Sequence, residues 1–329
     1  MKSVVEPVSS APKTSRPISA HHLMHIAMLI AVFFWGVNMV AIKEALSGFH
    51  PLALALVRAT AVAITFGTIF LFLRDRSLPR FTRGQWLRFV VIAFLGITLN
   101  QVLIIEGVAY TNVSHAALIV AVQPVMVLVL SVMMGLEGLT TLKLAGMGIS
   151  FSGVVLLTYG KAVHGGGAYW LGDVILLAEV VVFAHYTIML KEVVDQYDVI
   201  TLNTVIFGLG AILMIPFGAN ALLHQQWSQI PIRSFLGLAF MTFFSAVLGY
   251  LLFAYALKGL TASRVAAFNY IEPIVAMGLG IWLLHDRVGL WGFLGGGLIL
   301  LGVYFTECER GEDEADKSVP ENTAIETES

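Results

Sequence analysis

Ten apolar stretches, each about as long as a membrane-spanning helix, constrain this chain more than any other feature of its sequence. The hydrocarbon core of a bilayer is about 30 Å thick, and a helix of roughly 20 apolar residues crosses it. A soluble chain carries about 25% charged residues, whereas this chain carries 12% and is 58% apolar. We expect the seventh stretch to be the weakest, since it is short and contains Asn203 and Pro216. The sequence therefore predicts an all-α integral membrane protein with ten transmembrane helices, at approximately residues 23–42, 51–73, 86–106, 113–134, 143–160, 171–190, 200–217, 234–256, 262–284 and 289–306.

Most residues outside these stretches belong to the two ends of the chain. Residues 1–22 are a predicted cytosolic polar tail without the apolar core of a signal peptide. Residues 307–329 contain nine acidic side chains and are predicted to be a disordered cytosolic tail. With the N-terminus inside, fourteen of the 19 Lys and Arg residues face the cytosol and four face the opposite side, as the positive-inside rule requires. We expect a multi-pass protein of the cytoplasmic (inner) membrane with both termini in the cytosol.

The sequence contains an internal repeat. A shift of 149 residues places Ser114 on Ser263 and Glu137 on Asp286, and it aligns one Gln-Pro pair with a Glu-Pro pair. The same shift brings three glycines of the fifth stretch onto three of the tenth, namely Gly146, Gly148 and Gly153 onto Gly295, Gly297 and Gly302. The units are residues 23–160 and 171–306, with five spans each. Because five is odd, the second unit must enter the membrane from the opposite side, and such inverted repeats are typical of secondary transporters.

The repeated segments also resemble a known family. The chain is similar to the ten-span drug/metabolite transporter superfamily, in the branch built from two EamA domains, over about residues 23–306. The resemblance rests on WGVNMVAIKEAL, PLALALVRA, GVAYTNVSHAALIVAVQPVMVLVLSVMMGLEGLT and KGLTASRVAAFNYIEPIVAMGLGIWLLHDRV. It implies transport without ATP. It does not specify a substrate, because members move amino acids, nucleobases, sugar phosphates, nucleotide sugars and drugs.

One carboxylate lies well inside a predicted span, where a charge costs about 2.5–3.5 kcal/mol on insertion scales. Glu272 directly precedes Pro273 in the ninth span, and Asn269 lies on the same helical face. Pro273 has no N–H, so we expect the carbonyl of Asn269 to lack its helical partner. Gln123 and Pro124 repeat the arrangement in the fourth span. These helix breaks predict a substrate site; a kink satisfied by neighbouring helices is the alternative.

A second carboxylate, Glu179, lies in the sixth span. Phe183 and Tyr186 follow it at helical spacing, and His185 lies on a neighbouring face. Rings beside polar groups suit an organic substrate, although core packing with interhelical hydrogen bonds is the alternative. The repeat, with a shift of 148 residues, gives two matching candidates in the first span, Trp35 and Asn38.

Three more polar residues inside spans are candidates for lining a substrate path. Asn100 and Gln101 lie in the third span, and Tyr250 aligns with Gln101 in the eighth. Arg58 in the second span has two interpretations: it snorkels to the outer surface or pairs with a buried carboxylate. We expect its role to be structural.

The sequence thus predicts a secondary transporter that moves a small amphipathic metabolite such as an amino acid, with export implied by the resemblance. Protons on Glu272, Glu179 or His185 are the predicted coupling ions, with uncoupled movement as the rival. A channel or a non-transporting sensor is an alternative, and a membrane-embedded enzyme is a weaker one, because no catalytic motif is found. The predicted partners are the small-molecule substrate and the lipid bilayer, and the sequence does not decide whether the protein forms a homodimer. No metal, cofactor or nucleic acid is predicted, and the single Cys308 makes neither a disulfide nor a zinc site.

Overall fold

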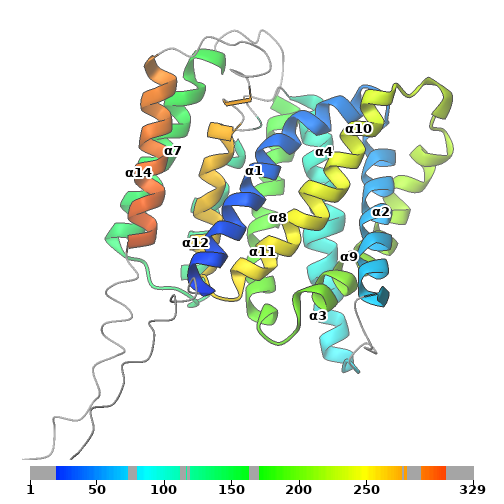
Figure 1. Cartoon of the computed structure of the whole chain (residues 1–329), viewed down its shortest axis with the longest axis horizontal. Helices are drawn as coiled ribbons and strands as arrows, with labels where there is room; N and C mark the ends of the chain where they lie inside the picture. Colours follow the sequence, from blue (N-terminus) through cyan, green and yellow to red (C-terminus); the bar gives the residue numbers. More distant parts are fainter. Residues whose placement is uncertain are drawn as a thin grey trace, which may run out of the picture.

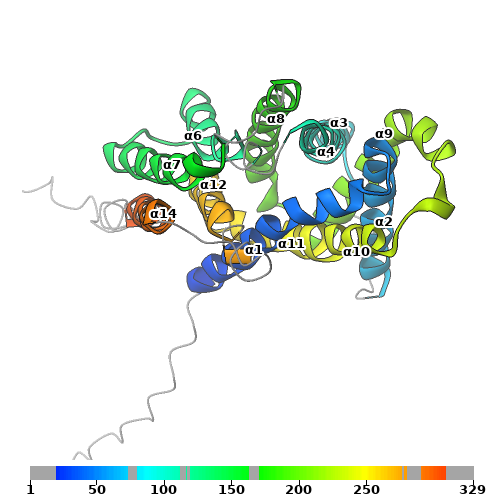
Figure 2. The ribbon, with the colours of Figure 1, turned by 90° about the horizontal axis from the view of Figure 1, so that it is seen from above.

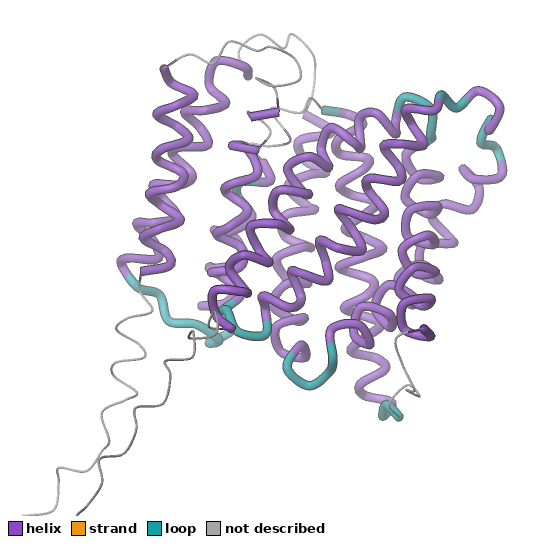
Figure 3. Tube along the Cα trace, in the orientation of Figure 1, coloured by secondary structure: helices purple, strands orange, loops and turns teal. Residues whose placement is uncertain are grey.

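The computed structural model describes residues 20–72, 80–111, 116, 119–162, 170–275, 278–279 and 290–308. In these ranges the chain is built from helices joined by short loops (Figure 3). The first half consists of α1 (Ala20–Leu46), α2 (Pro51–Phe72), α3 (Arg83–Ala93), η1 (Phe94–Leu99), α4 (Asn100–Tyr110), α6 (Gln123–Met133) and α7 (Thr141–Ala162). The second half consists of α8 (Trp170–Val194), α9 (Val199–Leu223), η2 (Trp227–Gln229), α10 (Ile232–Phe240), η3 (Met241–Leu248), α11 (Gly249–Leu257), α12 (Ala262–Ala267), η4 (Phe268–Ile271) and α14 (Leu290–Cys308).

The described helices agree with the predicted spans. Six of them are long and apolar enough to cross a membrane by length and composition, and three shorter apolar helices coincide with the fourth, fifth and tenth spans. The ninth span begins as α12 and η4. The expected weakness of the seventh span is wrong, because α9 is one continuous helix of 25 residues that includes Pro216. Asn203 is accommodated there by donating its side-chain N–H to the carbonyl of Val199, at 2.8 Å.

The two halves run in opposite directions through the bundle. Helix α1 begins, and α14 ends, at the same end of the molecule, whereas α7 ends and α8 begins at the other end (Figure 1). Seen from above, α7 and α14 lie at one edge, α2 and α9 lie at the opposite edge, and α1, α11, α4 and α8 lie between them (Figure 2). The fold is therefore a helical membrane bundle of two inverted repeats.

Small residues allow α7 and α14 to pack closely against each other. A Cβ atom on Gly146 would lie 2.7 Å from the carbonyl oxygen of Gly302, and one on Gly153 would lie 2.7 Å from the carbonyl oxygen of Gly295. The two contacts are equivalent, because the shift of 149 residues places Gly146 on Gly295 and Gly153 on Gly302. Gly148, on another face of α7, has no neighbour within 4 Å of such an atom.

This difference allows a matched test of the packing. Gly153→Ala is expected to destabilise the protein by about 1–3 kcal/mol, because overpacking forces two backbones apart. Gly148→Ala is expected to stabilise it slightly, since alanine favours a helix by about 0.5–1 kcal/mol over glycine. Thermal unfolding in detergent measures both variants. Equal unfolding midpoints for the two variants would show that α7 and α14 do not pack as described.

The corresponding third and eighth spans both contain a π-helical segment. Segment η1 separates α3 from α4, and η3 separates α10 from α11. Residues 94–99, shifted by 149, fall on 243–248, within η3. Each π segment directly precedes predicted lining positions, Asn100 and Gln101 in one half and Tyr250 in the other. Such segments are frequent at functional sites.

A buried carboxylate joins the two halves near the end of α6. Glu137 follows α6, and its carboxylate lies 3.3 Å from the ammonium of Lys143 on α7. The same carboxylate accepts hydrogen bonds from Ser263 of α12, from the backbone N–H at 3.0 Å and from the hydroxyl group. The side chains of Lys143 and Glu137 are 8% and 6% exposed, so solvent screens this connection little.

Candidate functional site

A small cavity of about 70 Å³ lies among the central helices. Nine of the residues that the sequence singles out line it: Trp35, Asn38, Asn100, Gln101, Gln123, Glu179, Phe183, Tyr250 and Glu272. They come from both halves of the chain. The remaining lining residues were not among the predicted site residues: Met39, Arg58, Ile104, Val120 and Ser245.

The two proline-containing segments meet beside this cavity. Asn269 donates its side-chain N–H to Oε1 of Gln123 at 2.6 Å, which joins the ninth span to the fourth. Pro124 occupies the first turn of α6, where a missing N–H leaves no helical bond unmade. Gln123 and Glu272 are 4% and 8% exposed, so neither faces lipid. The sequence repeat thus corresponds to a contact in space.

One expectation for this region is wrong. The carbonyl of Asn269 does have a partner, because the backbone N–H of Glu272 donates to it. The 3₁₀ segment η4 ends at Ile271 and is followed by Glu272 and then Pro273. The i→i+3 bonds of a 3₁₀ helix replace the i→i+4 bond that proline removes. The proline therefore changes the type of helix rather than leaving that carbonyl free.

Glu179 places an acidic group in the cavity from the middle of α8. Its Oε1 accepts a hydrogen bond from the side-chain N–H of Asn100 at 2.6 Å, so α4 orients the carboxylate. Its Oε2 and Oδ1 of Asn38 are both buried without a hydrogen-bond partner among the described residues. Buried polar atoms are nearly always paired. These two acceptors therefore mark a place where a ligand or water can donate a hydrogen bond.

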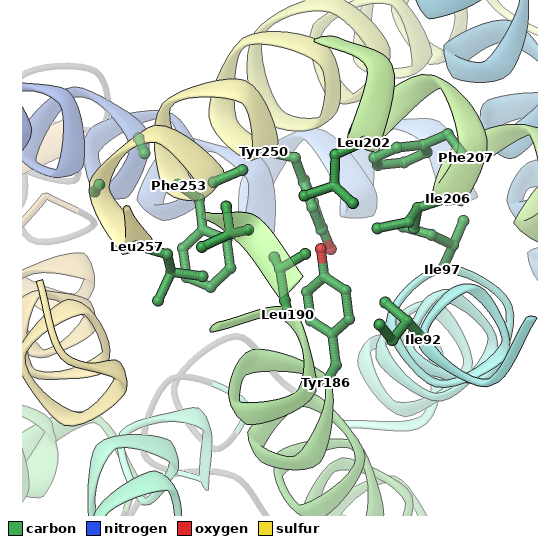
Figure 4. Close-up of a cluster of buried hydrophobic side chains, with 14 of the residues drawn as sticks. Ile92, Ile97, Tyr186, Leu190, Leu202, Ile206, Phe207, Tyr250, Phe253 and Leu257 are labelled. Atoms are coloured by element: carbon green, nitrogen blue, oxygen red, sulfur yellow. The ribbon is translucent and has the colours of Figure 1, made fainter. Parts of the chain in front are cut away.

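Aromatic rings form the apolar part of the wall. The indole N–H of Trp35 donates to the backbone carbonyl of Ser245 at 3.0 Å. This bond holds the ring against Phe183 and Tyr250, with centroid distances of 6.1 and 5.8 Å. Figure 4 shows the hydroxyl groups of Tyr186 and Tyr250 pointing toward one another. A ring wall beside polar groups suits a ligand with apolar and charged parts.

Arg58, for which the sequence predicts a structural role, lines the cavity. It is 3% exposed and pairs with no carboxylate of the described residues. Its guanidinium donates to Gln101, to the backbone carbonyl of Met241 at 3.2 Å and to Oγ of Ser245 at 3.4 Å. These partners lie 43 to 187 residues away along the chain. The only available signal was a charged residue inside an apolar span.

Three predicted residues do not line the cavity. Tyr186 is 1% exposed and lies in the hydrophobic cluster around the cavity. Asn269 contributes through its bond to Gln123. His185 lies on a neighbouring face of α8, as expected, and its Nδ1 contacts the carbonyl of Val181 in the same helix, at 2.9 Å. Proton coupling through His185 has no geometric support.

The cavity is smaller than a typical ligand site. Binding pockets for small molecules have volumes of about 300–1,000 Å³, against about 70 Å³ here. The latter volume accommodates a few water molecules. A substrate larger than a few water molecules therefore requires the lining helices to move apart.

A bundle of two inverted five-helix repeats with a polar cavity between them is the architecture of secondary transporters. The family model described as the EamA-like transporter family matches residues 22–159 and 170–307. The chain belongs to the EamA-like transporter family.

Known relatives match nearly their whole length. A protein of Archaeoglobus fulgidus named "Uncharacterized transporter" is 29% identical over 288 residues, covering 87% of this chain and 99% of the relative. An Escherichia coli protein named "Probable amino-acid metabolite efflux pump" is 26% identical over 289 residues, covering 85% of this chain and 93% of the relative. A solved crystal structure superposes with a TM-score of 0.71 at 15% identity, covering 90% of this chain and 99% of that chain; this likeness shows the fold alone. The protein is thus a multi-pass membrane transporter.

Proposed function

We propose that this protein is a secondary transporter that exports a small amphipathic metabolite, such as an amino acid, from the cytosol. The central observation is the cavity to which both inverted halves contribute polar and aromatic side chains. The name of the Escherichia coli relative supports this substrate class and direction. The charge distribution of the sequence supports an orientation in which both termini lie in the cytosol.

The mechanism that we propose is alternating access. The bond between Asn269 and Gln123 crosses between the halves at the cavity, and the Glu137 network crosses between them near the end of α6. Rocking of one half against the other opens the cavity first to one side and then to the other, around a site near the bilayer midplane.

Coupling to protons is part of this proposal. Glu179 and Glu272 line one cavity, and desolvation favours the neutral form of a carboxyl group. A carboxyl group that holds a proton in one step and the cationic part of the substrate in another links the two fluxes in opposite directions. Such a group thereby couples export of the substrate to entry of a proton.

Counterflow in proteoliposomes tests the function. Purified protein is reconstituted, the vesicles are loaded with one unlabelled amino acid at a time, and entry of the same labelled amino acid is measured. A carrier is expected to show saturable entry that the internal amino acid stimulates. Entry that rises linearly with concentration and does not respond to the internal amino acid would instead indicate a channel. Absence of counterflow for every amino acid would contradict the proposed substrate class.

A further inference from the structure

Arg58 carries a buried positive charge that the described part of the protein does not neutralise. The residue is 3% exposed, and its three hydrogen-bond partners are an amide oxygen, a backbone carbonyl and a hydroxyl group. None of the ion pairs found among the described residues involves Arg58. A buried charge is strongly unfavourable unless a counter-charge pairs with it. The guanidinium is therefore available to an anionic ligand.

The neutral partners of Arg58 also set its direction. Gln101 comes from α4, and Met241 and Ser245 come from η3, so two helices fix the guanidinium at the cavity wall. A guanidinium has five N–H donors, and the three hydrogen bonds described above leave two. Two parallel N–H groups match the two oxygens of a carboxylate. The fixed position and the remaining donors suit an anionic group that enters the cavity.

The same cavity contains the opposite chemistry. Oε2 of Glu179 and Oδ1 of Asn38 are buried acceptors without a donor among the described residues. Glu179, like Arg58, lines the cavity, but the two do not form an ion pair with one another. The site thus offers a negative and a positive pole that do not cancel each other. A molecule with both charges satisfies both poles at once.

We propose that Arg58 binds the anionic group of the transported molecule while Glu179 and Asn38 bind its protonated amino group, so that the site selects a zwitterion such as an α-amino acid. This assignment rests on the proposed function and deepens it. Trp35, Phe183 and Tyr250 contact the remaining, apolar part of the ligand. A molecule that lacks either charged group leaves one pole unpaired and binds less tightly.

Counterflow competition tests this assignment. The labelled amino acid with the largest counterflow competes against three unlabelled compounds: itself, its decarboxylated amine and its N-acetyl derivative. The wild-type protein is expected to prefer the amino acid over either derivative by about tenfold or more, as for loss of a hydrogen bond to a charged group. Arg58→Gln is expected to remove the preference over the amine, and Glu179→Gln is expected to remove the preference over the N-acetyl derivative.

Two further variants keep the test interpretable. Arg58→Lys retains the charge and is expected to restore part of the preference over the amine, which a purely structural role would not do. Lys43→Gln is the matched control, because Lys43 is a cation whose partners among the described residues are the backbone carbonyls of Val108 and Thr111. Lys43 does not line the cavity. Lys43→Gln is expected to keep the wild-type preferences.

The outcomes separate the inference from the function on which it rests. If the wild type exchanges an amino acid but Arg58→Gln keeps the wild-type preference over the amine, the assignment of Arg58 is wrong and the transport function stands. The assignment is also overturned if all three compounds lose their competition equally in Arg58→Gln and Arg58→Lys does not restore it. If the wild type exchanges no amino acid, the proposed function and this inference both fail.

Discussion

Glu179→Gln is expected to abolish the acceleration of transport by a pH gradient. Amide and carboxyl groups are similar in shape, but the amide does not release and take up a proton near neutral pH. The variant keeps an oxygen that accepts the hydrogen bond from Asn100, so the helix packing should survive. The measurement compares uptake into proteoliposomes with and without an imposed pH gradient. We expect a gradient-dependent rate in the wild type and equal rates in the variant.

A test at the second carboxyl group and a control substitution accompany this measurement. Glu272→Gln tests the other carboxyl group of the cavity, and the double variant tests whether either group suffices. Glu192→Gln is the control, because Glu192 pairs with Arg88 at a more exposed position, with side chains 30% and 39% exposed. If Glu179→Gln, Glu272→Gln and the double variant all keep full gradient-dependent transport, neither carboxyl group carries the coupling proton.

Glu137→Ala is expected to be the most destabilising substitution of a charged residue outside the cavity. It removes the acceptor of the Ser263 backbone N–H and hydroxyl group and the counter-charge of Lys143. Breaking a buried ion pair from one side costs about 3–5 kcal/mol. Removal of one partner of a partly exposed pair, as in Glu192→Ala, costs about 0–1 kcal/mol. Unfolding midpoints in detergent compare the two variants.

A functional measurement complements the stability measurement. Because the Glu137 network connects the halves, its loss should also change the rate at which they move against one another. Glu137→Gln keeps an acceptor for Ser263 and loses only the charge, so it should lie between Glu137→Ala and the wild type in unfolding midpoint. Equal midpoints for Glu137→Ala and Glu192→Ala would show that the network does not hold the halves together.

The fold was largely predictable because lipid leaves few alternatives. Inside a bilayer every backbone polar group must be satisfied within the segment, so apolar stretches of sufficient length become helices. Because each repeat unit has an odd number of spans, the two halves must then run in opposite directions. Pro216 and Asn203 predict a weak seventh span, whereas α9 is one continuous helix. Neighbouring helices and local side-chain bonds accommodate such residues in membranes.

The residues of the candidate site were predictable where polarity itself was the signal. Glu179, Glu272, Gln123 and Asn38 stand out because polar groups are costly in lipid, and all four line the cavity. Helical spacing could not tell that Phe183 lines the cavity and Tyr186 does not. Both side chains are buried and lie on nearby faces of α8. The role of Arg58 depends on hydrogen bonds to distant residues, which no local pattern contains.

The π-helical segments bear on the history of the chain. Each π turn holds an extra residue, which shifts the angular phase of everything after it by about 100° relative to an uninterrupted α-helix. A helical wheel drawn through the whole of the third or eighth span therefore misplaces the residues beyond η1 or η3. The same phase slip occurs at corresponding positions of both halves. Its simplest origin is one insertion in an ancestral five-helix unit, made before that unit was duplicated.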